Sequence, residues 1–263
     1  RPDILFSTLK AIKTERFYMY VTTNGWHMDE NTAKKLADHG VNRVSVSIDS
    51  MDEKVHDEFR GKKGSWKRAM KALDLVQKAG MHPYLNITVG HYNAKSEDIK
   101  LMLKYSKDKN YKTLLNVATP AGMWQNLTDI MVDEEDKKYL IEMRKEHKNI
   151  MRNLWDPFDK NYESVIGCNT VNRVYITPIG DVLSCPYVHI KIGNVYENSL
   201  KEISEHGFSF KRFRENSQAC LAGEDVGFVK NFMSKKGTSI FNPVKAEEIF
   251  PNDHYEKFSF DNN

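Results

Sequence analysis

The chain has 263 residues, of which 40% are hydrophobic and 29% charged, a composition typical of a globular protein with a sizeable core. Its 39 basic and 36 acidic residues are scattered along the sequence, so charge favours neither a nucleic-acid partner nor a membrane surface. No apolar run approaches the roughly 20 residues of a membrane span, and we expect no signal peptide.

Strand and helix patterns alternate through the first 150 residues. Helical spacing starts at Pro2, so we expect the sequence to begin inside a domain. Asp29 and Ser65 are the expected N-caps of two helices. We predict strands at residues 17–21, 41–48, 83–89 and 113–118, and helices at residues 2–13, 29–40, 56–61, 65–80, 97–107 and 133–148. Repeated βα units imply parallel strands, hence a barrel or a doubly wound sheet.

Two of the predicted strands alternate apolar and polar residues. The apolar sides are Val44, Val46, Ile48 and Leu85, Ile87, Val89, and the polar sides are Ser45, Ser47, Asp49 and Tyr84, Asn86, Thr88. A parallel sheet is covered on both faces, and unpaired polar groups inside it cost roughly 1–3 kcal/mol each. We therefore predict a polar ligand near the C-terminal strand ends, where barrel enzymes place their chemistry. A water-filled or self-satisfied interior is the alternative.

Short strands and turns replace this pattern after a looser stretch at residues 155–157. Residues 174–184 read as a hairpin, and residues 192–195 lead into a short helix from Ser199. The polar tail beyond about Asn242 is expected to lie loosely on the surface. We predict a partial β/α barrel at residues 1–150, a cysteine-bearing α+β domain at residues 151–225, and a C-terminal helix or tail at residues 226–263.

All three cysteines of the chain fall in this second region. Cys168 precedes the hairpin, Cys185 follows it, and Cys220 comes after the next helix. Three cysteines are too few for a disulfide framework, which favours a reducing cytoplasm. Three thiolates suit an iron–sulfur cluster or a zinc site completed by another ligand, and three inert buried thiols are equally compatible with this spacing.

Two ordered sets of motifs resemble a known superfamily over roughly residues 1–225. Thr22-Thr23-Asn24-Gly25, Val44-Ser45-Val46-Ser47-Ile48-Asp49 and His56-Asp57-Glu58-Phe59-Arg60-Gly61 resemble the core of radical S-adenosylmethionine (SAM) enzymes. Residues 176–185, followed by Ile192-Gly193-Asn194-Val195 and residues 199–203, resemble the SPASM or shorter twitch extension. The resemblance implies an α/β fold, a partial radical SAM barrel lacking its first units, followed by a small auxiliary-cluster domain.

The resemblance also implies cofactors and residue roles. A [4Fe–4S] cluster binds SAM and cleaves it reductively to a 5′-deoxyadenosyl radical, and the protein supplies positioning. Ser47 matches a SAM-contacting serine, with Asp49 beside it. The implied cofactor-facing residues are Thr23, Asn24, Ser47, Asp49, Arg60 and Asn86, and the implied auxiliary [4Fe–4S] ligands are Cys168, Cys185 and Cys220. Arg60 could instead be a solvated charge.

Two features of the family pattern are missing. The CxxxCxxC loop and the Gly-Gly-Glu segment precede, in relatives, the point where this sequence starts. We expect truncation, so the 263 residues alone should lack the SAM cluster and be inactive. A fourth auxiliary cysteine is also absent. Ser217 and Gly223 stand at spacings where one could lie. His189 is either a fourth ligand or, as we expect, a residue that packs on the surface or in the hairpin.

These features predict a radical SAM oxidoreductase or maturase-like enzyme that abstracts hydrogen from a substrate. The expected partners are a peptide or small-molecule substrate and a reductant such as flavodoxin or ferredoxin, with no nucleic acid and no membrane. The alternative is a non-catalytic binding module that keeps the barrel and is stabilised by zinc or a cluster.

Overall fold

The computed structural model describes residues 2–12, 14–151, 168, 170–214, 219–234, 239–240, 242–253 and 258–262. The chain divides into two compact units. The first comprises Arg1–Val89, Asn93–Asn116 and Glu142–Asn153, and the second comprises Gly90–Tyr92, Val117–Ile141 and Leu154–Asn263. The units therefore interleave along the sequence, whereas the boundaries expected at residues 150 and 225 divide it linearly and stay predictions. The looser stretch at residues 155–157 lies outside the described residues.

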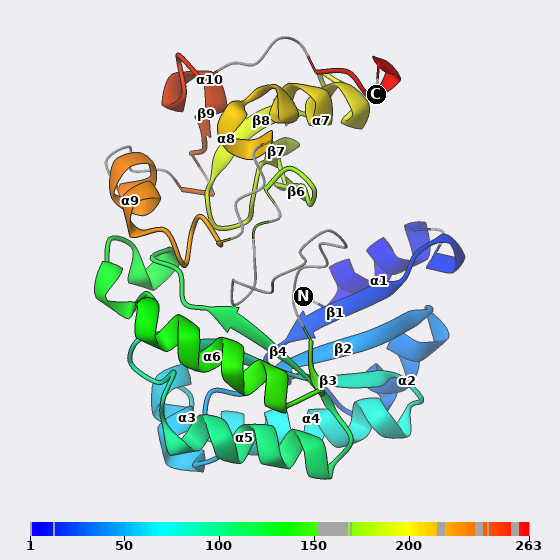
Figure 1. Ribbon diagram of the computed structural model, residues 1–263. Coiled ribbons are helices and arrows are strands. Elements are labelled where there is room, and N and C mark those ends of the chain that lie inside the picture. Colours follow the sequence, from blue (N-terminus) through cyan, green and yellow to red (C-terminus); the bar gives the residue numbers. More distant parts are fainter. Residues whose placement is uncertain are drawn as a thin grey trace. The chain divides into compact units, whose positions relative to one another are not determined.

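The first unit is built on a five-stranded sheet of order β1-β2-β3-β4-β5 (Figure 1). Each strand pair with a described register is parallel, which confirms the predicted α/β fold. The strands are β1 (Met19–Thr23), β2 (Val41–Ser47), β3 (His82–Val89), β4 (Lys112–Val117) and β5 (Ile150–Met151). The helices are α1 (Pro2–Ala11), α2 (Glu30–Asp38), α3 (Glu53–Arg60), α4 (Ser65–Lys78) and α5 (Glu97–Asp108), with α6 (Glu134–Glu146) spanning both units.

Helices cover the apolar side of this sheet. α2 contacts β2, and α4 contacts both β2 and β3. The predicted apolar side chains are completely buried: Val44, Val46, Ile48, Leu85, Ile87 and Val89. Gly25, in the turn after β1, has a left-handed φ of 76°, and a Cβ there would lie 2.9 Å from Cα of Ala69 in α4. Only glycine therefore lets this turn pack directly on α4.

The N-terminus of α4 differs from the prediction, because Ser65 is not its N-cap. The helix begins at Ser65, and its N-cap is Gly64, which has no side chain to bond the first turn. Asp57 on α3 takes this role, accepting bonds from the Gly64 and Trp66 N–H groups and from the Ser65 hydroxyl. These bonds lower the pKa of the Asp57 carboxyl, with the Trp66 N–H as the largest cause.

The second unit carries a four-stranded sheet of order β6-β7-β8-β9. The strands are β6 (Tyr175–Ile176), β7 (Asp181–Leu183), β8 (Ile190–Asn194) and β9 (Val244–Lys245). β6 and β7 pair antiparallel, which confirms the predicted hairpin. Ser199 caps α7 (Leu200–Ser209) through a capping box with Glu202, as expected from its position.

The tail was expected to lie loosely on the surface, and for residues 244–250 this is wrong. β9 pairs in parallel with β8, and α10 (Ala246–Ile249) follows it directly. Phe250 is 3% exposed and packs in a cluster of aromatic rings with Phe210, Phe213, Phe228 and Phe232. The cluster joins α8 (Lys211–Arg214), α9 (Val226–Phe228) and a π-helical turn at Val229–Ser234 to the tail.

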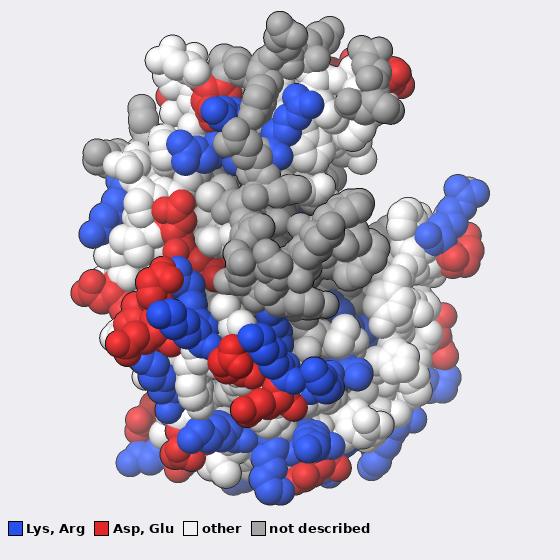
Figure 2. All heavy atoms as spheres, viewed as in Figure 1, with Lys and Arg blue, Asp and Glu red and all other residues white. Residues whose placement is uncertain are grey.

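Surface charge is mixed on the face seen in Figure 2, where basic and acidic side chains are interspersed over the helices of the lower half. Several charged side chains of the protein pair along a helix, such as Lys104 with Asp108 and Lys145 with Glu142. Within the described part of the chain, no helix combines the length and apolar character needed to cross a membrane.

Candidate functional site

A row of polar side chains crosses the first sheet opposite its apolar side. The register aligns Thr22 with Ser45 and then Tyr84, and it aligns Ser47 with Asn86. Asn116 on β4 donates a hydrogen bond to Asn86 and extends the row. Two of the predicted cofactor-facing residues, Ser47 and Asn86, thus lie side by side near the C-terminal strand ends.

This polar side contains buried groups that lack hydrogen-bond partners among the described residues. These groups are the Ser45 hydroxyl and Nε of Arg43. The Arg43 guanidinium stacks between two rings, 4.2 Å from the Tyr20 centroid and 4.5 Å from the Tyr84 centroid. Each unpaired group costs roughly 1–3 kcal/mol, so the polar side is suited to a ligand rich in donors and acceptors.

Thr23 and Asn24, the predicted residues at the end of β1, form hydrogen bonds within their own turn. Thr23 aligns with the buried Val46, so it lies on the apolar side, and its hydroxyl accepts a bond of 3.1 Å from the Gly25 N–H. Asn24 is exposed and accepts from the Trp26 N–H, closing the turn. Thr22, which belongs to the same predicted motif but not to the predicted cofactor-facing set, occupies the polar side instead.

Asp49 and Arg60 form an ion pair beyond the end of β2, between a mostly buried carboxylate and a partly exposed guanidinium. The Arg60 guanidinium donates to both carboxylate oxygens of Asp49, at 2.5 and 3.0 Å, and the Asp49 side chain is 7% exposed. The Asp49 N–H donates to Nδ1 of the buried His56 at 3.1 Å. This bond fixes the neutral tautomer of His56, with its proton on Nε2. Asp49 and Arg60, both predicted as cofactor-facing, therefore contact each other and fix each other's side-chain position.

His56 is expected to make stability depend on pH. Burial lowers the pKa of its imidazole in the folded protein. Below the unfolded pKa of about 6.5, the unfolded chain binds a proton that the folded chain does not, so the free energy of unfolding falls as the pH drops. Urea unfolding of wild type between pH 7.5 and 5.5 should show this loss, up to about 1.4 kcal/mol per pH unit. His56→Gln should show a smaller loss, and equal losses would contradict the assignment.

The three cysteines lie within electrostatic range of one another inside the second unit. Cys168 raises the pKa of Cys185, and both raise the pKa of Cys220. Cys220 is buried, Cys168 and Cys185 are half-buried, and none forms a disulfide. The hydroxyl of Thr170 lies 3.0 Å from Sγ of Cys168. The hairpin and the turn at Cys220 thus bring together thiols that are far apart in sequence.

Backbone amides point at two of these sulfurs. The Tyr187 and Val188 N–H groups bond the Cys185 sulfur, and the Ala222 N–H bonds the Cys220 sulfur. Such bonds favour the thiolate. Burial opposes it and raises the pKa of Cys185 to about 11 and that of Cys220 well above its usual value. Buried thiols near one another, with amides aimed at their sulfurs, suit a metal or cluster whose positive charge neutralises them.

Two neighbours of the thiols were missed from sequence. The phenol of Tyr187 has a raised pKa, caused by burial and then by Cys185 and Cys220, which places it beside both thiols. The carboxylate of Glu224, a residue only 6% exposed, also raises the pKa of Cys220. His189, the histidine considered as a ligand, follows in the same turn with a left-handed φ of 53°.

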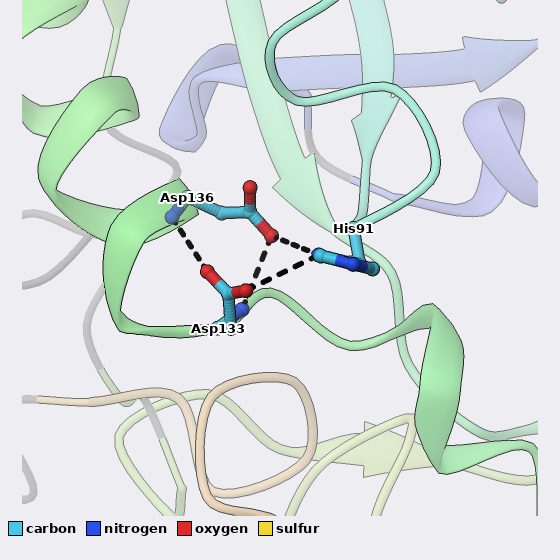
Figure 3. Close-up of side chains that lie close together, drawn as sticks. All are labelled: His91, Asp133 and Asp136. Atoms are coloured by element: carbon cyan, nitrogen blue, oxygen red, sulfur yellow. Dashed lines mark hydrogen bonds and ion pairs between the residues drawn. The ribbon is translucent and has the colours of Figure 1, made fainter.

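A second group of possible metal ligands comprises His91, Asp133 and Asp136 (Figure 3). Nδ1 of His91 lies 2.7 Å from Asp136 Oδ2 and 3.4 Å from Asp133 Oδ2. The two aspartates also bond each other's backbone N–H groups at the start of α6. These contacts explain the cluster without a metal. The two aspartates cap the start of α6, and His91 links the segment after β3 to that helix.

Family models match both regions of the chain. The radical SAM superfamily model covers residues 1–105, and the model of the SPASM iron–sulfur cluster-binding domain covers residues 168–222. The second match contains Cys168, Cys185 and Cys220, and the first contains the polar row from β1 to β3.

Curated relatives match over most of this chain. An AdoMet-dependent heme synthase of Methanosarcina barkeri is 25% identical, over 82% of this chain and 68% of its own length. A probable GTP 3',8-cyclase of Sulfolobus acidocaldarius is 29% identical, over 73% and 63%. The subtilosin biosynthesis protein AlbA of Bacillus subtilis is 23% identical, over 70% and 42%. The chain thus spans about two thirds or less of these relatives.

Solved structures share the fold. Streptococcus suis SuiB superposes with a TM-score of 0.54 at 17% identity, covering 74% of this chain and 50% of SuiB, and it has also been solved with S-adenosylmethionine and with its precursor peptide SuiA. The enzyme anSMEcpe with bound AdoMet superposes with a TM-score of 0.51 at 19% identity, covering 78% and 60%.

Proposed function

The chain belongs to the radical SAM superfamily and carries a SPASM segment, and on this premise we propose that it is part of a radical SAM enzyme with an auxiliary [4Fe–4S] cluster. Cys168, Cys185 and Cys220 hold the cluster in this proposal. When bound, SAM supplies a 5′-deoxyadenosyl radical through one-electron cleavage, and this radical abstracts a hydrogen atom from the substrate.

The grouping of the three thiols carries the proposal. Their mutual effects on pKa, their burial and the amides aimed at two sulfurs support a site for a multiply charged cluster. A [4Fe–4S] cluster takes thiolate ligands, and N–H bonds to the sulfurs are among the factors that set its potential. Inert thiols would share the burial, but they would need neither this grouping nor amides aimed at their sulfurs.

The polar row of the first sheet is the proposed SAM-facing surface. Ser47 and Asn86 present a hydroxyl and an amide there, while Asn24 and Thr23 close the turn beside it. Arg60 has five N–H donors, and two of them bond Asp49. In this proposal, a SAM carboxylate would accept hydrogen bonds from the remaining donors. Asp49 would then act indirectly: it would orient Arg60 and would not itself contact SAM.

In this proposal, the 263 residues alone provide cysteines for one cluster only. The sequence contains three cysteines, and all three are assigned to the auxiliary cluster. None remains for a SAM cluster, so this chain alone should not cleave SAM. The substrate is proposed to be a peptide or a small organic molecule, since the relatives include a bacteriocin biosynthesis protein and a probable GTP 3',8-cyclase. A flavodoxin or ferredoxin would supply the electron.

Anaerobic reconstitution of the wild-type chain with iron and sulfide tests the proposal. We expect about four irons and four sulfides per chain, with charge-transfer absorption in the visible range. One tightly bound zinc, with no iron and no such absorption, would instead support the non-catalytic zinc-stabilised module.

A further inference from the structure

The guanidinium of Arg43 on β2 forms no ion pair or hydrogen bond with any group in the described part of the chain. Its Nε is buried, whereas its two terminal nitrogens are not among the buried unpaired atoms, and the residue as a whole is half-buried. The terminal nitrogens are therefore accessible to a ligand. A buried polar nitrogen normally has an acceptor, so the unpaired guanidinium indicates a place where one binds.

Two tyrosine rings hold this guanidinium in place. Tyr20 and Tyr84 belong to β1 and β3, the strands on either side of β2, and their ring centroids lie 4.2 and 4.5 Å from Cζ of Arg43. The rings attract the positive charge, but they offer no oxygen acceptor for the five N–H donors of the guanidinium. The side chain is thus pre-oriented while its donors stay available.

Two hydroxyl groups add donors near Arg43. Ser45 is the next residue on the same side of β2, it is 0% exposed, and its hydroxyl has no partner among the described residues. Tyr18 precedes β1, and the pKa of its phenol is raised by burial and by Tyr84 and lowered by Arg43, which places this phenol near both side chains. The raised pKa keeps the phenol protonated at neutral pH, so it serves as a donor.

This group of donors is separate from the row that faces SAM in the proposed function. Ser47 lies four residues beyond Arg43 on the same strand, which corresponds to about 13 Å at 3.3 Å per residue. The group is accessible from the β1 side, where Tyr18 is 60% exposed and Tyr20 is 48% exposed. A ligand therefore reaches Arg43 without displacing the buried core.

We propose that Arg43, Ser45 and Tyr18 form a binding site for an oxyanion, a carboxylate or phosphate group. The guanidinium donates parallel N–H bonds to two oxygens of such a group, which is the geometry in which arginine recognises both. The two hydroxyls donate further hydrogen bonds. The oxyanion is the remote end of the substrate, and this last assignment rests on the proposed function.

Titration of the wild-type chain tests the site directly. The protein is labelled with ¹⁵N in its arginine side chains, and inorganic phosphate or glutarate is added at neutral pH and constant ionic strength. The Nε–H resonance of Arg43, identified by its absence from Arg43→Lys, should shift in a saturable way with at least one of the two probes. A response to phosphate alone or to glutarate alone assigns the site to that group.

Arg68 is an internal control in the same spectra. Its guanidinium also lies over an aromatic ring, 4.4 Å from the Trp26 centroid, but it already donates to the Trp26 carbonyl. Its resonance should stay nearly unchanged. Equal responses at Arg43 and Arg68, or no response at Arg43 to either probe, would overturn the proposal.

Urea unfolding gives the second arm. Methionine fills the space between the two rings without a charge or a donor, so we expect Arg43→Met to fold. Bound ligand stabilises the folded chain, so the effective probe should raise the urea midpoint of wild type more than that of Arg43→Met. Arg68→Met measures the general stabilisation that phosphate gives by exclusion, and it should respond as wild type does. Equal midpoint increases in all three proteins would contradict the site.

The result is independent of the cluster, because the titrations use the chain without iron. A chain that takes up iron and sulfide but shows no response at Arg43 keeps the proposed function and overturns this inference. A chain that binds the probe at Arg43 but takes up no iron keeps the oxyanion site and overturns its assignment to the substrate of a radical SAM enzyme.

Discussion

Replacing Cys185 by alanine is expected to abolish cluster binding. This thiol lies at the end of the hairpin, it is coupled to both other cysteines, and two amides bond its sulfur. Two remaining thiols cannot hold a four-iron cluster, so iron and sulfide should fall from about four per chain to near zero, with loss of visible absorption. Iron and sulfide analysis after anaerobic reconstitution measures the effect.

Ser184→Ala is the matched control, because it alters the preceding residue by a single oxygen. The Ser184 hydroxyl is buried and has no hydrogen-bond partner among the described residues, so its removal should leave the cluster intact. Retention of a full cluster in Cys185→Ala would refute the ligand assignment. Loss of the cluster in both variants would point to damage to the hairpin.

Replacing Phe250 by alanine is expected to have the largest effect on stability. Its ring lies 5.1 Å from Phe232, 5.4 Å from Phe213, 6.2 Å from Phe210 and 6.5 Å from Phe228, measured between centroids. Truncation leaves a cavity among rings that come from two separate stretches of the chain, residues 210–213 and 228–232. We expect the free energy of unfolding to fall by about 3–5 kcal/mol, measured by urea denaturation.

Phe260→Ala provides the comparison within the same tail. Phe260 is 46% exposed, and only part of its ring packs against Phe208 and Phe258. Its loss should cost clearly less than that of Phe250. Similar small effects for both variants would show that the tail contributes little to the fold.

Sequence patterns predicted those elements of both units that are encoded by residues close together in the sequence. Alternation in β2 and β3 identified the buried side of the sheet, and Asp29 and Ser199 cap helices through contacts within three residues. The hairpin followed from its turn residues. These features depend on neighbours in sequence, which periodicity and turn chemistry describe.

Features that depend on distant residues were missed. Ser65 resembles an N-cap, yet Asp57 supplies the capping oxygen from the preceding helix. Phe250 follows a polar stretch, and only the folded second unit shows its aromatic partners. Glu224 was not predicted as a neighbour of the thiols, because cysteine spacing does not indicate a buried carboxylate. Its burial next to Cys220 is a tertiary property that no spacing rule contains.

The interleaving of the two units constrains how this protein can be dissected. Val117–Ile141 belongs with the cysteine-bearing unit although it precedes Glu142–Asn153 of the other one. A single cut near residue 150 would leave Val117 on one fragment and Gly223, which packs against it, on the other. Fragment expression and domain exchange therefore need joined, non-contiguous pieces, and a simple C-terminal fragment starting there should be a poor scaffold for iron.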